Sequence, residues 1–164
     1  MKASSLVFSY LMSLLFAHGT ILASVIGVAP RAALLQQLQL GLEIKLKDYN
    51  LPSYLTTKLP TGNRPELMTS TFMSAWTQLT YSVCKQAVVK GQVPPNLSTP
   101  DSIKKWLTKI SVNSWSTPSQ ANEIQTAYDA GFNSANTGLP QNVRLALSCS
   151  YVLSSPNVYA TTAH

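Results

Sequence analysis

The stretch FMSAWTQLTYSVCKQA, residues 72–87, decides the fold class. Its apolar residues recur at spacings of four, three, four and four, at Phe72, Trp76, Leu79, Val83 and Ala87. Because an α-helix has about 3.6 residues per turn, this spacing places all of them on one face. Lys90 and Gly91 then form a stop signal. The stretch therefore predicts a long amphipathic helix, beginning soon after Glu66, that packs one face against a core.

Three further helices are predicted downstream. Residues 99–101 (Thr-Pro-Asp) combine an N-cap residue, a proline at the first helical position and an acid in the first turn. Thr117 and Gln120 have the spacing of a capping box, so we expect a third helix to start there. Pro140 opens a fourth helix, which we expect to end before Pro156. Four helices in succession predict a mainly α domain over residues 66–164.

Cys84 and Cys149 are the only two cysteines, and they fall on the first and fourth predicted helices. An even count in an exported chain predicts one structural disulfide. Closing so long a loop would stabilise the fold by about 4 kcal/mol through the unfolded chain's lost entropy. Two buried free thiols or one reactive thiol are the alternatives, although neither cysteine has a histidine beside it. We predict a small disulfide-linked four-helix bundle-like domain.

Residues 24–65 are expected to form an N-terminal arm and a connector, because residues 48–65 contain three prolines and no periodicity. The arm itself, residues 31–47, fits both helix and strand patterns. Since Gly41 costs a helix about 1 kcal/mol, we expect a short helix that becomes extended near Leu38. An extended segment of this kind can add a strand to a neighbour's sheet. The candidate partner-binding residues are the alternating Leu38, Leu40, Leu42, Ile44 and Leu46.

Residues 1–23 read as a signal peptide. Lys2 precedes an apolar run over residues 6–16, and Ala17-His18-Gly19 follows as a small-x-small cleavage site, with a second site after Ala23. The pattern predicts an exported protein, either periplasmic or outer-envelope or secreted. The alternative is an uncleaved anchor, because residues 6–29 are long and apolar enough to span a bilayer. In that case the protein would be associated with the membrane.

The charge of the chain argues against nucleic acid as a partner. The net charge is +6 because acids are scarce, and only 11% of residues are charged. A phosphate-binding surface needs Lys and Arg gathered on one face. The densest group is Lys104, Lys105 and Lys109, which we interpret as a solvated helix face. A polar surface with little charge is typical of exported proteins and of subunits embedded in assemblies.

The residue types present exclude most catalytic and metal chemistry. After a leader is removed, the one histidine left is His164, at the chain end, where a general base or metal ligand is poorly placed. Histidine-based triads, zinc sites and c-type haem therefore lack a component. The seven glycines form no phosphate loop, and the six acids are scattered. We expect neither an enzyme nor a cofactor.

A series of short motifs lies along residues 115–159 in the C-terminal part of the chain. Trp-Ser-Thr-Pro at 115–118 is followed by Glu123, Tyr128 and Gly131, and then by Arg-Leu-Ala-Leu at 144–147 and a Leu-Ser-Ser-Pro-Asn-Val-Tyr tail at 153–159. This resembles a helical domain of large exported proteins of planctomycetes and myxobacteria. The arginines that usually flank the family's turn are absent here. Larger members carry haem-binding Cys-x-x-Cys-His segments and this chain has none, so the resemblance implies a helical exported domain without a cofactor.

Two functions remain from these observations. The first is a non-catalytic structural or interaction subunit of an extracytoplasmic complex, of the envelope or secretion type, whose partners are other protein subunits. The second is a free secreted helical binding module, such as an enzyme inhibitor or a ligand carrier. The first predicts that the protein co-elutes with a large complex in size-exclusion chromatography, whereas the second predicts a monomer.

Overall fold

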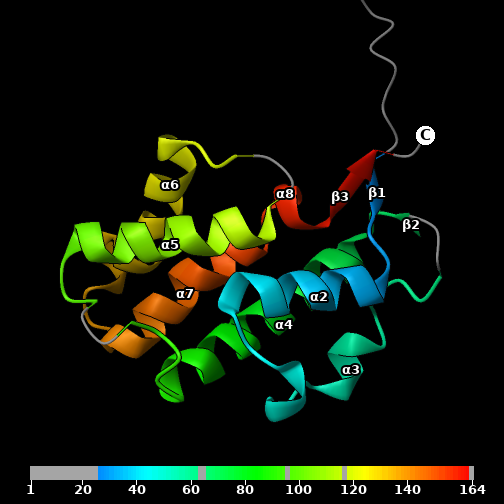
Figure 1. The fold of residues 1–164 in the computed structure, drawn as a ribbon, viewed down its shortest axis with the longest axis horizontal. Coiled ribbons are helices and arrows are strands. Elements are labelled where there is room, and N and C mark those ends of the chain that lie inside the picture. Colours follow the sequence, from blue (N-terminus) through cyan, green and yellow to red (C-terminus); the bar gives the residue numbers. More distant parts are fainter. Residues whose placement is uncertain (1–25, 63–65, 95–96, 116–117, 163–164) are drawn as a thin grey trace, which may run out of the picture.

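A computed structural model describes residues 26–62, 66–94, 97–115 and 118–162. The predicted signal peptide, Thr117 and His164 lie outside the described residues. Helices dominate the described part, and short strands lie together at one end of it (Figure 1). In chain order the elements are β1 (Ile26–Val28), α2 (Arg31–Leu42), the 3-10 turn η1 (Leu46–Asp48), α3 (Ser53–Thr56), β2 (Glu66–Leu67), α4 (Ser70–Val89), α5 (Pro100–Ser114), α6 (Ala121–Phe132), η2 (Ser134–Asn136), α7 (Gln141–Leu153), α8 (Pro156–Tyr159) and β3 (Ala160–Thr162).

The predicted fold class is confirmed. The helices α4, α5, α6 and α7 are those expected from the sequence, and α7 packs against the other three. The predicted stripe of α4 is buried, with Trp76, Leu79 and Val83 fully inaccessible to solvent. Cys84 of α4 and Cys149 of α7 form the predicted disulfide and are themselves fully buried. The result is a mainly α, disulfide-linked bundle with one hydrophobic core.

Helix starts follow the predicted signals at α5 but not at α6. The Thr99 side chain accepts a hydrogen bond from the Ser102 backbone N–H, and Pro100 occupies the first turn, as expected. The prediction of a third helix starting at Thr117 was wrong, because α6 begins at Ala121. The carboxylate of Glu123 accepts the backbone N–H of Gln120 at 2.8 Å and so makes the capping box three residues later. A carboxylate is a better partner there than the neutral Gln120 amide would be, because it also interacts favourably with the helix dipole.

The expected extended segment at residues 38–46 was also wrong. Residues up to Leu42 belong to α2, and the chain leaves the helix at Glu43, which has a left-handed backbone with φ of 55°. Four of the five candidate partner-binding residues are at most 9% exposed and lie in the molecule's own core; only Leu40, at 48%, faces solvent. The five are Leu38, Leu40, Leu42, Ile44 and Leu46. They form no free strand that a neighbouring sheet could accept.

Gly41 explains why the helix continues. A Cβ at this position would lie 3.0 Å from both Leu153 Cδ2 on α7 and Ser114 Cβ on α5. The missing side chain therefore lets α2 approach α5 and α7 closely, and Leu34 and Leu38 on the same helix become fully buried. Each buried leucine contributes roughly 1.5–3 kcal/mol, which outweighs the intrinsic cost of about 1 kcal/mol for a helical glycine.

A small antiparallel sheet joins the two ends of the described chain. Its strand order is β2-β1-β3, with Gly27 paired to both Leu67 and Thr161. The backbone of Ala29 donates to the Tyr159 carbonyl at 2.9 Å, which continues the pairing towards α8. α8 leads directly into β3 of this sheet and contacts α2 (Figure 1). Because strands of two or three residues carry almost no pattern, the sequence did not indicate this sheet.

Two tryptophans form hydrogen bonds to the end of α7 in addition to packing in the core. The Trp76 indole N–H donates to the Leu153 carbonyl at 3.0 Å, and the Trp115 indole N–H donates to the Val152 carbonyl at 3.0 Å. The last carbonyls of a helix lack partners within the helix, so these bonds complete the C-terminal turn of α7. They also anchor that turn to α4 and to the end of α5.

Candidate functional site

A pocket of about 860 Å³ lies between α4 and α6, with α7 between them as its floor. We call it the α4–α6 groove. Trp115 and α8 also contribute to its lining, and its volume falls within the range of ligand sites for small molecules. Its lining residues are Met73, Thr77, Gln78 and Tyr81 of α4; Trp115; Asn122, Glu123, Thr126 and Ala130 of α6; Leu147, Ser150 and Tyr151 of α7; and Ser154, Ser155, Pro156 and Tyr159.

The α4 wall is fixed to the floor by a disulfide and by buried hydroxyls. The Cys84–Cys149 bond joins the two helices covalently. The Thr80 hydroxyl oxygen lies 3.0 Å from that of Ser150 and 3.1 Å from that of Ser154, and it donates to the Thr77 carbonyl at 2.9 Å. Because these hydroxyls form hydrogen bonds with one another, the desolvation cost of burying polar atoms in the floor is offset.

The α6 wall packs closely against α7 because Gly131 has no side chain. A Cβ on Gly131 would lie 2.1 Å from the Arg144 carbonyl oxygen, so only glycine permits this approach. The Ser148 hydroxyl donates to the Tyr128 carbonyl at 3.2 Å, and Arg144 Nε donates to the Gly131 carbonyl at 3.3 Å. The Arg144 guanidinium also lies 4.3 Å from the centre of the Phe132 ring. These contacts set the position of α6.

Within the described part of the chain, Glu123 is the only acidic side chain that lines the groove, and it already has partners. Its Oε2 accepts the Gln120 backbone N–H at 2.8 Å, and its Oε1 accepts the Asn157 side-chain amide at 3.4 Å. The carboxylate thus caps α6 and links it to α8. No Lys or Arg of residues 26–62, 66–94, 97–115 or 118–162 lines the groove. The lining is therefore largely apolar and aromatic, with neutral polar groups between.

Tyr159 is the most buried tyrosine of the groove, at 3% exposure. Its ring packs edge-on against Phe72, with 5.5 Å between ring centres. Burial raises the pKa of the Tyr159 phenol above its ordinary value, so the hydroxyl stays protonated at neutral pH. Within the described part of the chain, nothing forms a hydrogen bond with this hydroxyl. It is therefore a donor that has no acceptor among these residues, although it still reaches solvent, in the lining of an apolar groove.

The sequence contained a spacing pattern for the residues that line this groove, but it lies next to the stronger pattern of the buried core residues and is easily overlooked. Met73, Thr77 and Tyr81 are spaced by four, and so are Leu147 and Tyr151 on the floor. Asn122, Thr126 and Ala130 repeat the spacing on the opposite wall. When a helix has a second row of residues at helical spacing beside its buried row, that second row indicates another face that contacts a further part of the protein or a ligand. None of the five predicted partner-binding residues lies in the groove.

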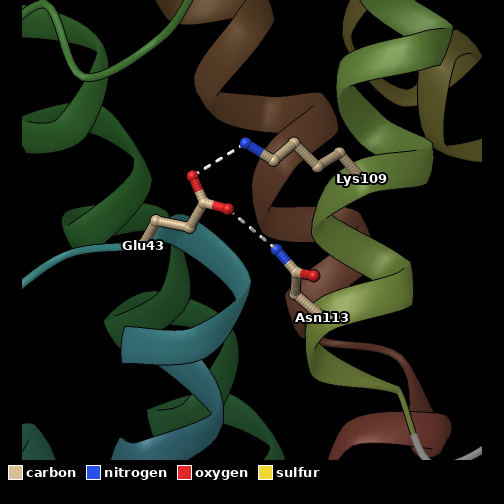
Figure 2. Close-up of polar contacts among 3 residues, drawn as sticks. All are labelled: Glu43, Lys109 and Asn113. Atoms are coloured by element: carbon tan, nitrogen blue, oxygen red, sulfur yellow. Dashed lines mark hydrogen bonds and ion pairs between the residues drawn. The ribbon is translucent and has the colours of Figure 1, made fainter.

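One group of charged and polar side chains outside the groove links two helices. Figure 2 shows Glu43 accepting from Lys109 at 2.7 Å and from Asn113 at 3.4 Å, which ties the end of α2 to α5. The Lys109 hydrogen bond is the main cause that lowers the pKa of Glu43. Lys104, from the same predicted basic patch, lies 5.3 Å from the centre of the Tyr128 ring. Two of the three lysines of this patch therefore have partners on the protein itself.

Comparisons with known proteins identify no family for this chain. No family model matches the chain, and neither a curated protein nor a solved structure is similar to it. The resemblance of residues 115–159 stays a prediction. Within residues 26–62, 66–94, 97–115 and 118–162, no helix is both long and apolar enough to cross a bilayer. The same residues contain no group of three or more His, Cys, Asp or Glu side chains that could hold a metal ion.

Proposed function

We propose that this protein is a non-catalytic binding module that acts outside the cytoplasm and holds a small molecule in the α4–α6 groove. The observation that carries the proposal is the groove itself, about 860 Å³ in volume, with a mostly apolar lining and few polar groups. Ligand sites commonly have this composition. The one carboxylate of the groove is engaged in capping α6, which supports a role in binding over a role in proton transfer.

Export is the second part of the proposal. The signal-peptide pattern of residues 1–23 motivates it, and the Cys84–Cys149 disulfide supports it because such bonds persist in oxidising compartments. The intact mass of the protein from its native source, measured with and without reductant, tests this part. We expect a chain that starts after residue 19 or 23 and gains two hydrogens on reduction. A full-length mass would instead support a membrane-associated protein.

The assembly hypothesis now has weaker support than the binding module. It was motivated by an unpartnered alternating segment, whereas Leu38, Leu42 and Ile44 are buried in the core. Its remaining support is the low charge of the chain. Size-exclusion chromatography of the native protein separates the two functions, because the binding module is expected near its own mass and the subunit in a large complex.

Two adjacent exposed residues of α6 provide a matched test of the groove. Thr126 lines it and Gln125 does not, although both are exposed. Thr126→Trp should fill the groove, whereas Gln125→Trp adds the same bulk outside it. We expect the unchanged protein to bind N-phenyl-1-naphthylamine or 8-anilinonaphthalene-1-sulfonate saturably, as read by dye fluorescence. Thr126→Trp should abolish this binding and Gln125→Trp should retain it. Equal binding by both variants, or no saturable binding of either dye, would contradict the proposal.

A further inference from the structure

The charge of the α4–α6 groove restricts its ligands. Among the residues that the structure describes, none of the lining side chains is a lysine or an arginine. The carboxylate of Glu123 accepts hydrogen bonds from Gln120 and Asn157. A buried anion would therefore lack a counter-charge, and burying an unpaired charge costs several kcal/mol. A cation would have to compete with the partners that Glu123 already has. The groove is thus best matched to an uncharged molecule.

Aromatic side chains dominate the apolar part of the lining. Tyr81, Trp115, Tyr151 and Tyr159 come from four different parts of the chain, and Met73 and Leu147 lie among them. Aromatic rings bury large areas and favour stacked or edge-on contact with other rings, and a methionine side chain adapts its shape to either. Such a lining fits a molecule that contains flat or compact rings.

The Tyr159 hydroxyl supplies the specific polar contact. Among the described residues the one side-chain polar atom that is buried without a partner is Arg31 Nε, so the Tyr159 hydroxyl still reaches solvent and can exchange a water for an acceptor on a ligand. Tyr159 is 3% exposed, lines the groove, and has no hydrogen-bond partner for its hydroxyl among the described residues. The nearby hydroxyls of Thr80, Ser150 and Ser154 already bond to one another. Tyr159 is therefore the donor that an acceptor on a ligand would satisfy.

We propose that the α4–α6 groove binds an uncharged, ring-containing apolar molecule with a hydrogen-bond acceptor that takes the Tyr159 hydroxyl as its donor. This inference rests on the proposed function, since it names the ligand class of the same groove. It predicts two separate selectivities: one against negative charge, set by the lining as a whole, and one for an acceptor, set by a single hydroxyl.

The first selectivity is tested by two dyes that share one ring system. N-phenyl-1-naphthylamine is neutral, and 8-anilinonaphthalene-1-sulfonate adds a sulfonate to it. We expect the neutral dye to bind at least about tenfold more tightly, because the sulfonate has no cationic partner in the groove. Each dye is titrated against the unchanged protein, with Thr126→Trp as the control for binding elsewhere. Equal or tighter groove binding of the sulfonate would overturn the inference.

The second selectivity is tested with Tyr159→Phe, which keeps the ring and removes the hydroxyl. Prodan is a neutral naphthalene dye with a ketone acceptor, whereas the nitrogen of N-phenyl-1-naphthylamine is a poor acceptor because its lone pair is delocalised. We expect the variant to bind prodan roughly 2- to 10-fold more weakly and the amine dye equally well. A blue shift of bound prodan emission should accompany the loss. Equal losses for both dyes, or none for prodan, would overturn the role of Tyr159.

The outcomes separate the two proposals. If neither neutral dye nor the sulfonate binds in a manner sensitive to Thr126→Trp, the proposed function fails. If groove binding occurs but favours the sulfonate or ignores the Tyr159 hydroxyl, the proposed function stands and the ligand class is wrong. Thermal melts of each variant show whether a loss of binding reflects a loss of folding.

Discussion

The two sides of α7 differ in how closely their helices approach. On the side of α2 and α5, Gly41 brings α2 within van der Waals contact of Ser114 and Leu153, and a small pocket of about 270 Å³ lies beside this contact. On the side of α4 and α6, the helices are fixed to α7 at Cys149 and beside Arg144, and the α4–α6 groove remains between them. The comparison shows that both glycines close a seam, but the space beside the α4–α6 side is much larger, about 860 Å³ against about 270 Å³ beside Gly41. The groove follows from how its walls are anchored.

Removing the disulfide should have the largest effect on the groove side. The variant Cys84→Ala/Cys149→Ala is expected to lose about 4 kcal/mol of unfolding free energy, because the unfolded chain regains the entropy of a long loop. Urea denaturation measures this loss. Adding reductant to the double variant should change nothing, which controls for other effects of the reagent. A loss below about 1 kcal/mol would show that apolar packing and the hydrogen bonds of Trp76 and Thr80 hold α4 to α7 without the disulfide.

Gly131→Ala should be the next most damaging change. The new Cβ would overlap the Arg144 carbonyl, and backbone atoms cannot move away as a flexible side chain can. We expect a loss of about 3 kcal/mol or more and weaker dye binding, since α6 must shift from α7. Gly138→Ala is the matched control, because a Cβ there meets nothing within 4 Å. Equal stability of the two variants by denaturation would contradict the assigned role of Gly131.

Gly41→Ala should be milder and should spare the groove. Its Cβ would meet the flexible end of Leu153 and the side chain of Ser114 at 3.0 Å, so small adjustments relieve the contact. The gain in helix propensity, about 1 kcal/mol, offsets much of the overpacking. We expect a net loss of at most about 1 kcal/mol and unchanged dye affinity. Loss of dye binding in this variant would show that the two sides of α7 are not independent.

The smallest effect concerns pH and the Glu43 contacts of Figure 2. The hydrogen bond from Lys109 lowers the pKa of Glu43 in the folded state, so its contribution is present above the unfolded-state pKa. It is lost as pH falls through the folded-state pKa. Unfolding free energies of the unchanged protein and of Glu43→Gln should differ slightly at neutral pH and converge in acid. A gap that widened on acidification would contradict this sign.

The sequence predicted those features that short-range chemistry controls. The stripe of α4, the cap at Thr99 and the end of α7 before Pro156 each follow from local spacing, and the structure has all three. The pairing of Cys84 with Cys149 also followed, because only one pair exists. Local rules were sufficient at these positions because each local signal favours one structure clearly over the alternatives.

The prediction failed where packing outweighs local preference. The alternation over residues 38–46 and the cost of Gly41 in a helix both favoured a strand. The structure has a helix there because Gly41, which has no side chain, lets α2 pack closely against Leu153 and Ser114. The α4–α6 groove was missed for a related reason. Its lining side chains have helical spacing, but the space between the walls depends on Gly131 and the disulfide, which join residues distant in sequence.

The most direct test of the account is backbone amide NMR during titration with N-phenyl-1-naphthylamine. We expect shift changes to gather on residues 73–81, 122–130 and 147–156, which contain most of the lining of the α4–α6 groove. The amides of α2 and the middle of α5 should not move. Changes that centred on the α2–α5 seam, or saturable binding that left the groove residues unshifted, would contradict the claim that the open side of α7 is the binding site.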